Sequence, residues 1–271
     1  SIYAQEIDPD QLRLKEIYAT RIQTPPVLDG VLDDEVWENV VPESEFLQFK
    51  PYNLELPAEK TEVRIVYDDD YIYVAVNCLT SHPEKIVGRL GRRDNWFEVL
   101  GPKSDWAVVA FDSNNDDRTG NHFFVNPAGS RMDVALTGPG MAGFDRSWDA
   151  VWDFKTALNE DGWSVEYRIP FSIFSFEANS DKDWGFLAAR HIQYKQEETQ
   201  WPCVPFGVEG FVPYYGVLKG ISDVPPPKQL EVVPYLLSGK TDDLNSNSTG
   251  LDLKYGFNAR SALHLTFNPD F

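Results

Sequence analysis

EVRIVYDDDYIYVAVNCL, residues 62–79, carries the clearest strand signal in the chain. Two runs rich in β-branched and aromatic residues flank Asp68, Asp69 and Asp70. Valine, isoleucine and tyrosine favour pleated strands, whereas aspartate favours turns because its side chain satisfies nearby backbone groups. The stretch therefore predicts a β-hairpin with its turn at the three aspartates.

Strand-length runs of the same kind recur along the chain. They cover 105–111, 122–125, 150–158, 163–169, 184–194 and 214–218, with Gly, Pro and Asp clusters between them. Helical periodicity is brief and is clearest in LDDEVWENV, residues 32–40, where Asp33 is the expected N-cap and Trp37 the expected core residue. Many short strands with regular turn signals predict an all-β protein, a jelly-roll-like β-sandwich over residues 21–220.

The charge balance restricts the class of partner. Among 271 residues, 43 are acidic and 24 are basic, giving a formal net charge of −19. No cluster of Lys and Arg carries interleaved aromatic residues, so nucleic acid is excluded as a partner, and cations or neutral ligands are favoured. The two cysteines, Cys78 and Cys203, show no zinc-binding spacing and define no disulfide framework.

The two ends of the chain differ in style from the middle. The opening SIYAQEIDPDQ, within an N-terminal extension over residues 1–20, looks like the end of a signal peptide, which predicts an exported protein. A proline-rich linker over 221–229 follows the sandwich, and LDLKYGFN (251–258) and ALHLTFN (262–268) then alternate strictly between apolar and polar residues. This alternation fits either an edge meander of a soluble sheet or the first strands of an outer-membrane barrel.

FDSNNDDRTGNHFFVNP, residues 111–127, places many short oxygen-bearing side chains between two strands. Asp and Asn tolerate tight turns, so one interpretation is a metal-free hairpin loop. Asp112, Asn114 and Asp116 also fall on alternate positions, and calcium collects oxygen ligands from such loops. The spacing is not that of an EF-hand, because Asp117 stands at the glycine position and Phe123 at the glutamate position.

Several stretches together resemble carbohydrate-binding module family 9. They are PVLDGVLDDEVW (26–37), TEVRIVYDDDYIYVAV (61–76), the 105–112 strand with its NNDDRTG loop, and WSVEYRIPFSIF (163–174). The resemblance is closer to a bacterial subgroup in which the module precedes an outer-membrane β-barrel of unknown function. Its marks are GRRDNW (91–96), FFVNPAG (123–129), WDAVWDF (148–154), LEVVPY (230–235) and LTFNPDF (265–271).

The resemblance implies an overall organisation. Residues 230–271 would be the first strands of a truncated barrel, and the module would lie in the periplasm or at the cell surface. This implication favours the barrel interpretation of the alternating strands.

The resemblance also implies a carbohydrate site. Sugar-binding members clamp a sugar between two tryptophans, and the nearest matches are Trp96 and Trp201, with Asn126 of the FFVNPAG motif as a further contact. The alternative is that both rings cover the ends of the sandwich core. This sequence departs from the pattern at two polar contact positions, where Glu and Arg are replaced by Val108 and Phe124.

Structural calcium is implied for some members of the family. The matching ligands would be Asp112, Asn114, Asp116 and Asp117.

No nucleophile elbow, zinc-protease or phosphate-loop motif occurs in the chain. The acidic residues alone leave a two-carboxylate glycosidase open. The sequence favours a non-catalytic binding module, with a plug or gating domain of the barrel as the alternative that involves no sugar.

Overall fold

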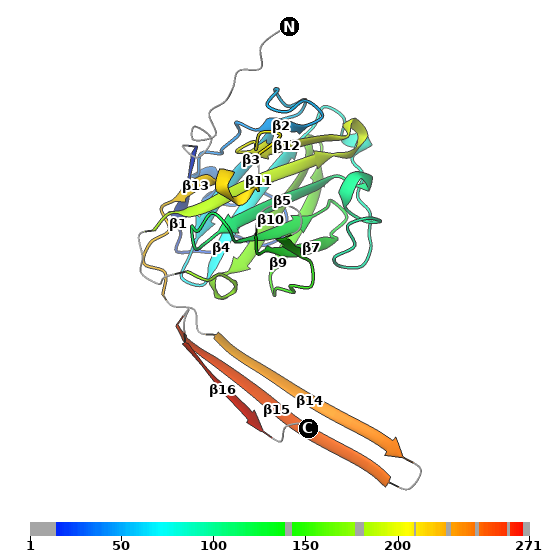
Figure 1. Cartoon of the computed structure of the whole chain (residues 1–271). Coiled ribbons are helices and arrows are strands. Elements are labelled where there is room, and N and C mark those ends of the chain that lie inside the picture. The colour runs from blue at the N-terminus through cyan, green and yellow to red at the C-terminus, as the bar shows by residue number, and fades with distance from the viewer. Residues whose placement is uncertain are drawn as a thin grey trace.

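The computed structural model describes residues 15–138, 143–176, 182–208, 210–225, 229–241, 244–258 and 261–267. Strands dominate, and they form a curled two-layer sandwich followed by a separate three-stranded sheet (Figure 1). The predicted all-β sandwich is confirmed.

Sheet I of the sandwich has the order β8-β7-β6-β5-β11-β13, and β12 and β2 extend it from β11. The bounds are β8 Phe144–Asp145, β7 Arg131–Leu136, β6 Gly120–Val125, β5 Trp106–Asp112, β11 Trp184–Ile192, β13 Gly216–Lys219, β12 Glu197–Trp201 and β2 Leu47–Lys50. Except for β13 against β1, its strands pair antiparallel.

Sheet II has the order β3-β4-β10-β9, with bounds β3 Thr61–Tyr67, β4 Tyr71–Leu79, β10 Gly162–Pro170 and β9 Asp153–Asn159. Strand β1, Glu16–Arg21, joins the two sheets. Its first half runs parallel to β13 and its second half parallel to β3. The remaining elements are the short α2, Glu35–Glu38, and 3-10 turns at Pro83–Lys85, Gly101–Lys103, Phe171–Ile173, Gln193–Lys195 and Val212–Tyr214.

The hairpin predicted from residues 62–79 is formed by β3 and β4. Tyr67 pairs with Ile72 in register, and the turn lies at the three aspartates. Asp68 organises this turn, because its Oδ1 accepts the backbone N–H groups of Asp70 and Tyr71, each at 2.8 Å. Its Oδ2 accepts the Tyr73 hydroxyl at 2.7 Å, which ties the turn to the following strand.

The main core lies between the two sheets. Alternate residues of β3, β4 and β10 face alternate residues of β5, β6 and β11, and large buried rings such as Trp163, Phe111 and Phe123 fill the space. All seven residues of β5 are buried, so this strand is covered on both faces. Strands buried on both faces read as continuous apolar runs, which explains WAVVAF in the sequence.

A buried carboxylate fixes the PVLDGVLDDEVW segment onto the outer face of sheet II. Glu166 of β10 accepts the backbone N–H groups of Asp29 (3.0 Å) and Gly30 (2.7 Å), and the Trp37 indole N–H (2.9 Å). Trp37 is buried in a small cluster beneath α2, as predicted. The N-cap position is Asp34 rather than the expected Asp33, and its carboxylate instead accepts the Val27 N–H.

The last three strands form their own antiparallel sheet. They are β14 (Gln229–Thr241), β15 (Leu244–Asn258) and β16 (Ser261–Phe267), and they lie apart from the sandwich in Figure 1. Within the described residues, β14 and β16 each pair only with β15. Among those same residues, no helix has the length and apolar character needed to cross a membrane.

Replacing Gly30 with alanine should destabilise the sandwich more than the same change at Gly129. Both glycines have positive φ, +92° and +83°, so each alanine carries a conformational penalty of about 1–2 kcal/mol. A Cβ at Gly30 would also lie 2.5 Å from the Thr156 backbone carbon, whereas nothing lies within 4 Å of one at Gly129. We expect overpacking to add about 1–3 kcal/mol at Gly30 alone, measured by urea denaturation. Equal losses for the two variants would show that Gly30 is not held by close backbone approach.

Candidate functional site

A second apolar cluster covers the outer face of sheet I. Val108 and Ala110 of β5, Phe124 of β6 and Leu187 of β11 point to this face, away from the main core. Val108 and Phe124 are cross-strand partners, and both are buried. The two positions that depart from the sugar-binding pattern are therefore buried within an apolar cluster.

Aromatic rings cross this face in a continuous row, which we call the aromatic file. Neighbouring ring centroids lie 5.2–6.5 Å apart, within the range of favourable aromatic contact. In order, the rings belong to Phe206, Phe49, Phe211, Phe144, His122, Phe124 and Trp96.

Both ends of the aromatic file reach the solvent. Phe206 is 53% exposed at one end. At the other end Trp96 is half-buried, and the adjacent Phe97 is 68% exposed. Cations lie over two of these rings: Lys50 Nζ is 5.3 Å from the Phe49 centroid, and the Arg146 guanidinium carbon is 5.6 Å from that of Phe97.

His122 lies in the middle of the aromatic file as a neutral group. Burial lowers the pKa of His122 to about 4, so its imidazole is uncharged near pH 7. Its Nε2 lies 2.7 Å from the hydroxyl of Tyr215, and burial raises the pKa of that hydroxyl. The pair therefore adds a neutral hydrogen bond to this face and no charge.

Trp201 lies elsewhere and is fully buried. It ends β12, and its ring contacts Phe186 in the main core at a centroid distance of 6.1 Å. Trp96 packs on the outer cluster, against Phe124 and Trp106. Since the two tryptophans belong to different clusters and Trp201 has no exposed face, they do not form the expected open clamp in this structure. Trp201 instead covers the core, which was the alternative interpretation.

Asn126 organises a turn. Its Oδ1 accepts the Ser130 N–H at 2.8 Å, and its Nδ2 donates to the Arg89 carbonyl at 2.7 Å and to Ser104 Oγ at 3.3 Å. The side chain is fully buried. Asn126 therefore braces the segment that leads to Trp96, and it does not reach a ligand at the surface.

The loop between β5 and β6 is held by its own carboxylates. Asp112 accepts the N–H groups of Asp116 (3.3 Å) and Asp117 (2.9 Å). Asp116 accepts those of Arg118 (2.9 Å) and Thr119 (2.8 Å), together with the Thr119 hydroxyl (2.8 Å). Many of the loop oxygens are thus used within the loop, as the hairpin interpretation expects.

The two carboxyl groups differ in electrostatic environment. Burial raises the pKa of Asp112, although hydrogen bonds from Asp117 and Asp116 oppose it. Partial burial also pushes the pKa of Asp116 upward, but hydrogen bonds from Thr119 and Arg118 outweigh it and lower the pKa. In the described part of the chain, no group of three or more His, Cys, Asp or Glu side chains is arranged to hold a metal ion.

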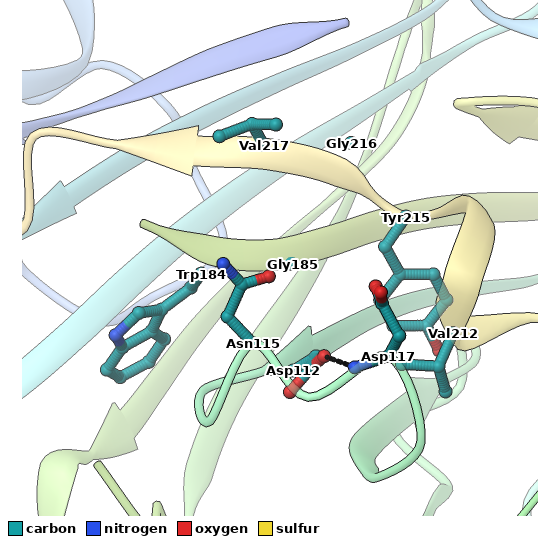
Figure 2. A pocket seen from close by; sticks show the side chains of 9 residues that line it. All are labelled: Asp112, Asn115, Asp117, Trp184, Gly185, Val212, Tyr215, Gly216 and Val217. Atoms are coloured by element: carbon teal, nitrogen blue, oxygen red, sulfur yellow. Dashed lines mark hydrogen bonds between the residues drawn. The ribbon is translucent and has the colours of Figure 1, made fainter. Parts of the chain in front are cut away.

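Pockets lie on both sides of this loop. Figure 2 shows the pocket of about 180 Å³. Asp112, Asn115 and Asp117 line one side of it, and Gly185 of β11 and Gly216 of β13 line the other. The other, of about 260 Å³, lies between the loop, β7 and Trp148.

Solved structures show what the fold resembles. A carbohydrate-binding module family 9 domain from Caldicellulosiruptor kristjanssonii, in complex with glucose, matches 77% of this chain over 98% of its own length, with a TM-score of 0.53 and 19% identity. A candidate carbohydrate-binding protein from Bacteroides uniformis ATCC 8492 matches 76% of the chain over 98% of its length, with a TM-score of 0.55 and 13% identity. The chain has the fold of a family 9 module.

Sequence comparison adds little to this result. No family model matches the chain. An alanine–tRNA ligase from Alkaliphilus oremlandii (strain OhILAs) is 36% identical over 70 residues, which are 26% of this chain and 8% of the ligase. The chain thus matches less than a tenth of that relative's length, and the similarity shows no family.

The module fold brings together rings that the sequence did not single out. They come from three separate segments: Phe49 lies in β2, Phe144 in β8, and both Phe206 and Phe211 in the loop between β12 and β13. For Phe49, Phe206 and Phe211 the local signal was the concentration of aromatic residues in QFKPY (48–52) and VPFGVEGFVPYY (204–215), which overlap β2 and the 3-10 turn before β13.

Calcium binding to the 112–117 loop stays a prediction, and melting temperature can test it. An ion bound only by the native state stabilises that state by mass action, so millimolar calcium added after chelator treatment should raise the melting temperature. Asn114→Ala is the matched variant, because it removes one predicted ligand while the Asn114 side chain makes no hydrogen bond in the described part of the chain. We expect a smaller calcium shift in this variant and an unchanged melting temperature without calcium. An absent shift in the wild-type chain would rule out the site.

Proposed function

We propose that the chain is a non-catalytic module that binds carbohydrate on the aromatic file. The observation that carries the proposal is the row of rings across the outer face of sheet I, open to solvent at Phe206 and followed in sequence, after Trp96 at its other end, by the exposed Phe97. The fold supports it, since one neighbour of this fold is a module solved with glucose.

The chemistry of the aromatic file suits a sugar ring. Pyranoses present an apolar C–H face that packs on aromatic rings, while their hydroxyl groups need hydrogen-bond partners at the edge. Lys50 and Arg146, which lie over the rings of Phe49 and Phe97, supply donors at the two ends. Val108 and Phe124 are apolar and buried and so supply no charged anchor, and we expect recognition by stacking on the exposed rings at the two ends.

Trp96 keeps its proposed role with a different partner. It is half-buried at the end of the aromatic file and next to the exposed Phe97. We propose that Trp96 and Phe97 hold one end of the ligand and Phe206 the other. All seven members of the aromatic file are rings rather than carboxyl groups, which favours binding over glycoside hydrolysis, since that reaction uses a pair of carboxyl groups.

A glycan array probed with the full chain tests the proposal. We expect the wild-type chain to retain one or more neutral glycans. Phe206→Ala should bind them at least tenfold more weakly, because a tenfold change corresponds to the roughly 1.4 kcal/mol of one lost ring contact. Phe206→Tyr keeps the ring and should bind like the wild type. Leu158→Ala is the control, since Leu158 is a similarly exposed apolar residue of β9 in sheet II. Because the module is proposed to be non-catalytic, the bound glycan should be recovered without hydrolysis. Binding by Phe206→Ala at wild-type strength would reject the aromatic file as the site.

We further propose that the module belongs to an exported protein and that β14–β16 begin an outer-membrane barrel. The register places Val232, Leu253 and Leu265 side by side, and next to them Pro234, Leu251 and Phe267. Val232, Leu265 and Phe267 are exposed. A sheet with an exposed apolar ladder and two outer strands that each have one partner is expected to open readily in water.

Hydrogen exchange tests this second part. Residues 229–267 should exchange much faster than β3 and β4 in buffer, and detergent micelles should slow the exchange of the former alone. If the tail of a detergent-free monomer is protected as strongly as β3 and β4, the barrel interpretation is wrong. A plug domain with no sugar ligand would instead combine this exchange pattern with an empty glycan array.

A further inference from the structure

The pocket of about 260 Å³ beside Trp148 is lined by an unusual combination of side chains. The lining residues that matter are Ser113, Asn114, Thr119, Asn121, Thr137 and Trp148. Among the described residues that line it there is no Asp, Glu, Lys, Arg or His, although the chain carries a net charge of −19. The described lining is thus polar and uncharged within an acidic protein.

Its polar groups retain hydrogen-bonding capacity. In the described part of the chain, the side-chain amides of Asn114 and Asn121 make no hydrogen bond, and each amide offers two donors and one acceptor oxygen. The Ser113 hydroxyl donates to the Ser175 carbonyl (2.9 Å) and the Thr119 hydroxyl to Asp116 (2.8 Å), so both oxygens can still accept. Donors and acceptors are therefore mixed around one small space, which matches a ligand bearing several hydroxyl groups.

The apolar wall of the pocket comes from the main core. Trp148 packs edge-on against Phe123 at a centroid distance of 5.9 Å and is half-buried, so part of its indole borders the pocket. Ile173 lines the pocket beside it. An indole face next to amides and hydroxyls can contact both parts of a sugar ring, its apolar C–H face and its hydroxyl groups.

We propose that this pocket binds a single neutral pyranose or cyclic polyol, as a second site separate from the aromatic file. Its size is below that of pockets for drug-sized ligands, about 300–1,000 Å³, so one ring fits and an oligosaccharide extends beyond it. A sugar acid finds no cationic side chain among the described lining residues and loses hydration on entry, so it binds more weakly than a neutral sugar. The proposal shares the ligand class of the proposed function, but it rests on different residues.

Its residues also lie on the other side of sheet I. Asn121 and Phe123 of β6 belong to the face that meets the main core, whereas His122 and Phe124 point to the aromatic file. Changes in one site therefore need not disturb the other.

Ligand-observed NMR on the full chain tests the proposal with four probes: glucose, galactose, mannose and myo-inositol. We expect at least one to bind in the millimolar range or tighter, and glucuronate to bind at least tenfold more weakly than glucose. Asn121→Leu keeps the size of the side chain but removes the amide, and Thr137→Val removes a hydroxyl at constant shape. Each should weaken binding at least tenfold, whereas Leu158→Ala, at the exposed apolar residue of β9, should leave it unchanged.

The outcomes separate this proposal from the proposed function. If Phe206→Ala abolishes monosaccharide binding while Asn121→Leu and Thr137→Val retain it, the pocket is overturned and the aromatic file stands. If none of the four probes binds the wild-type chain, the pocket is overturned and the glycan array decides the aromatic file independently. Trp148→Phe guards against misfolding, because it keeps an aromatic contact with Phe123. If the Trp148→Phe variant and the Asn121→Leu variant each bind the probe with wild-type affinity, the pocket is also overturned.

Discussion

The burial of sheet I on both faces is the constraint from which the rest of the structure follows. Apolar side chains on one face of β5, β6 and β11 meet sheet II, and those on the other face must be covered by something else. No second layer of strands lies there within the described residues, so loops supply the cover. Those loops carry Phe206, Phe211 and Trp96. The proposed binding surface is thus a consequence of packing: the rings are there because β5 and β6 need covering, and their outer edges reach the solvent.

Loops that cover a sheet need to be fixed, and buried carboxylates fix them here. Asp133 of β7 is fully buried and accepts Arg93 Nε at 3.0 Å and the Ala150 N–H at 2.7 Å, which joins the GRRDNW and WDAVWDF segments. Glu166 plays the same part for the 26–37 segment on sheet II. Burial raises the pKa of Glu166, and the hydrogen bonds from Gly30, Trp37 and Asp29 oppose that shift. Hydrogen bonds to charged groups contribute about 1.5–3 kcal/mol each, so the donors around such a carboxylate offset part of its cost of desolvation.

The sequence predicted what depends on neighbours along the chain. The β3–β4 hairpin was visible because its propensity and its turn chemistry agree within 18 residues. Trp201 was misjudged for the opposite reason: TQWPCVPFG reads as a loop, yet β12 pairs with β11, and the ring is placed in the core by this long-range pairing. Asn126 was expected to contact a sugar from its place in the FFVNPAG motif, but its side chain bonds to Arg89 and Ser104, contacts that the local sequence does not encode. Exposure is a property of tertiary packing, so it could not be read from these segments.

The distribution of charge connects the fold to the choice of ligand. The carboxylates of Asp133, Glu166 and Asp112 accept hydrogen bonds that hold loops in place, and Arg93 is hydrogen-bonded to Asp133. A carboxylate that already accepts backbone N–H groups is a poor anchor for a ligand, because the ligand would have to displace donors that hold the loop. The two candidate surfaces present rings, amides, hydroxyls and a neutral imidazole, with Lys50 and Arg146 at the ends of the aromatic file. A protein built this way distinguishes its ligands by shape and hydrogen-bond pattern, and its overall negative charge repels anionic sugars before they reach either surface.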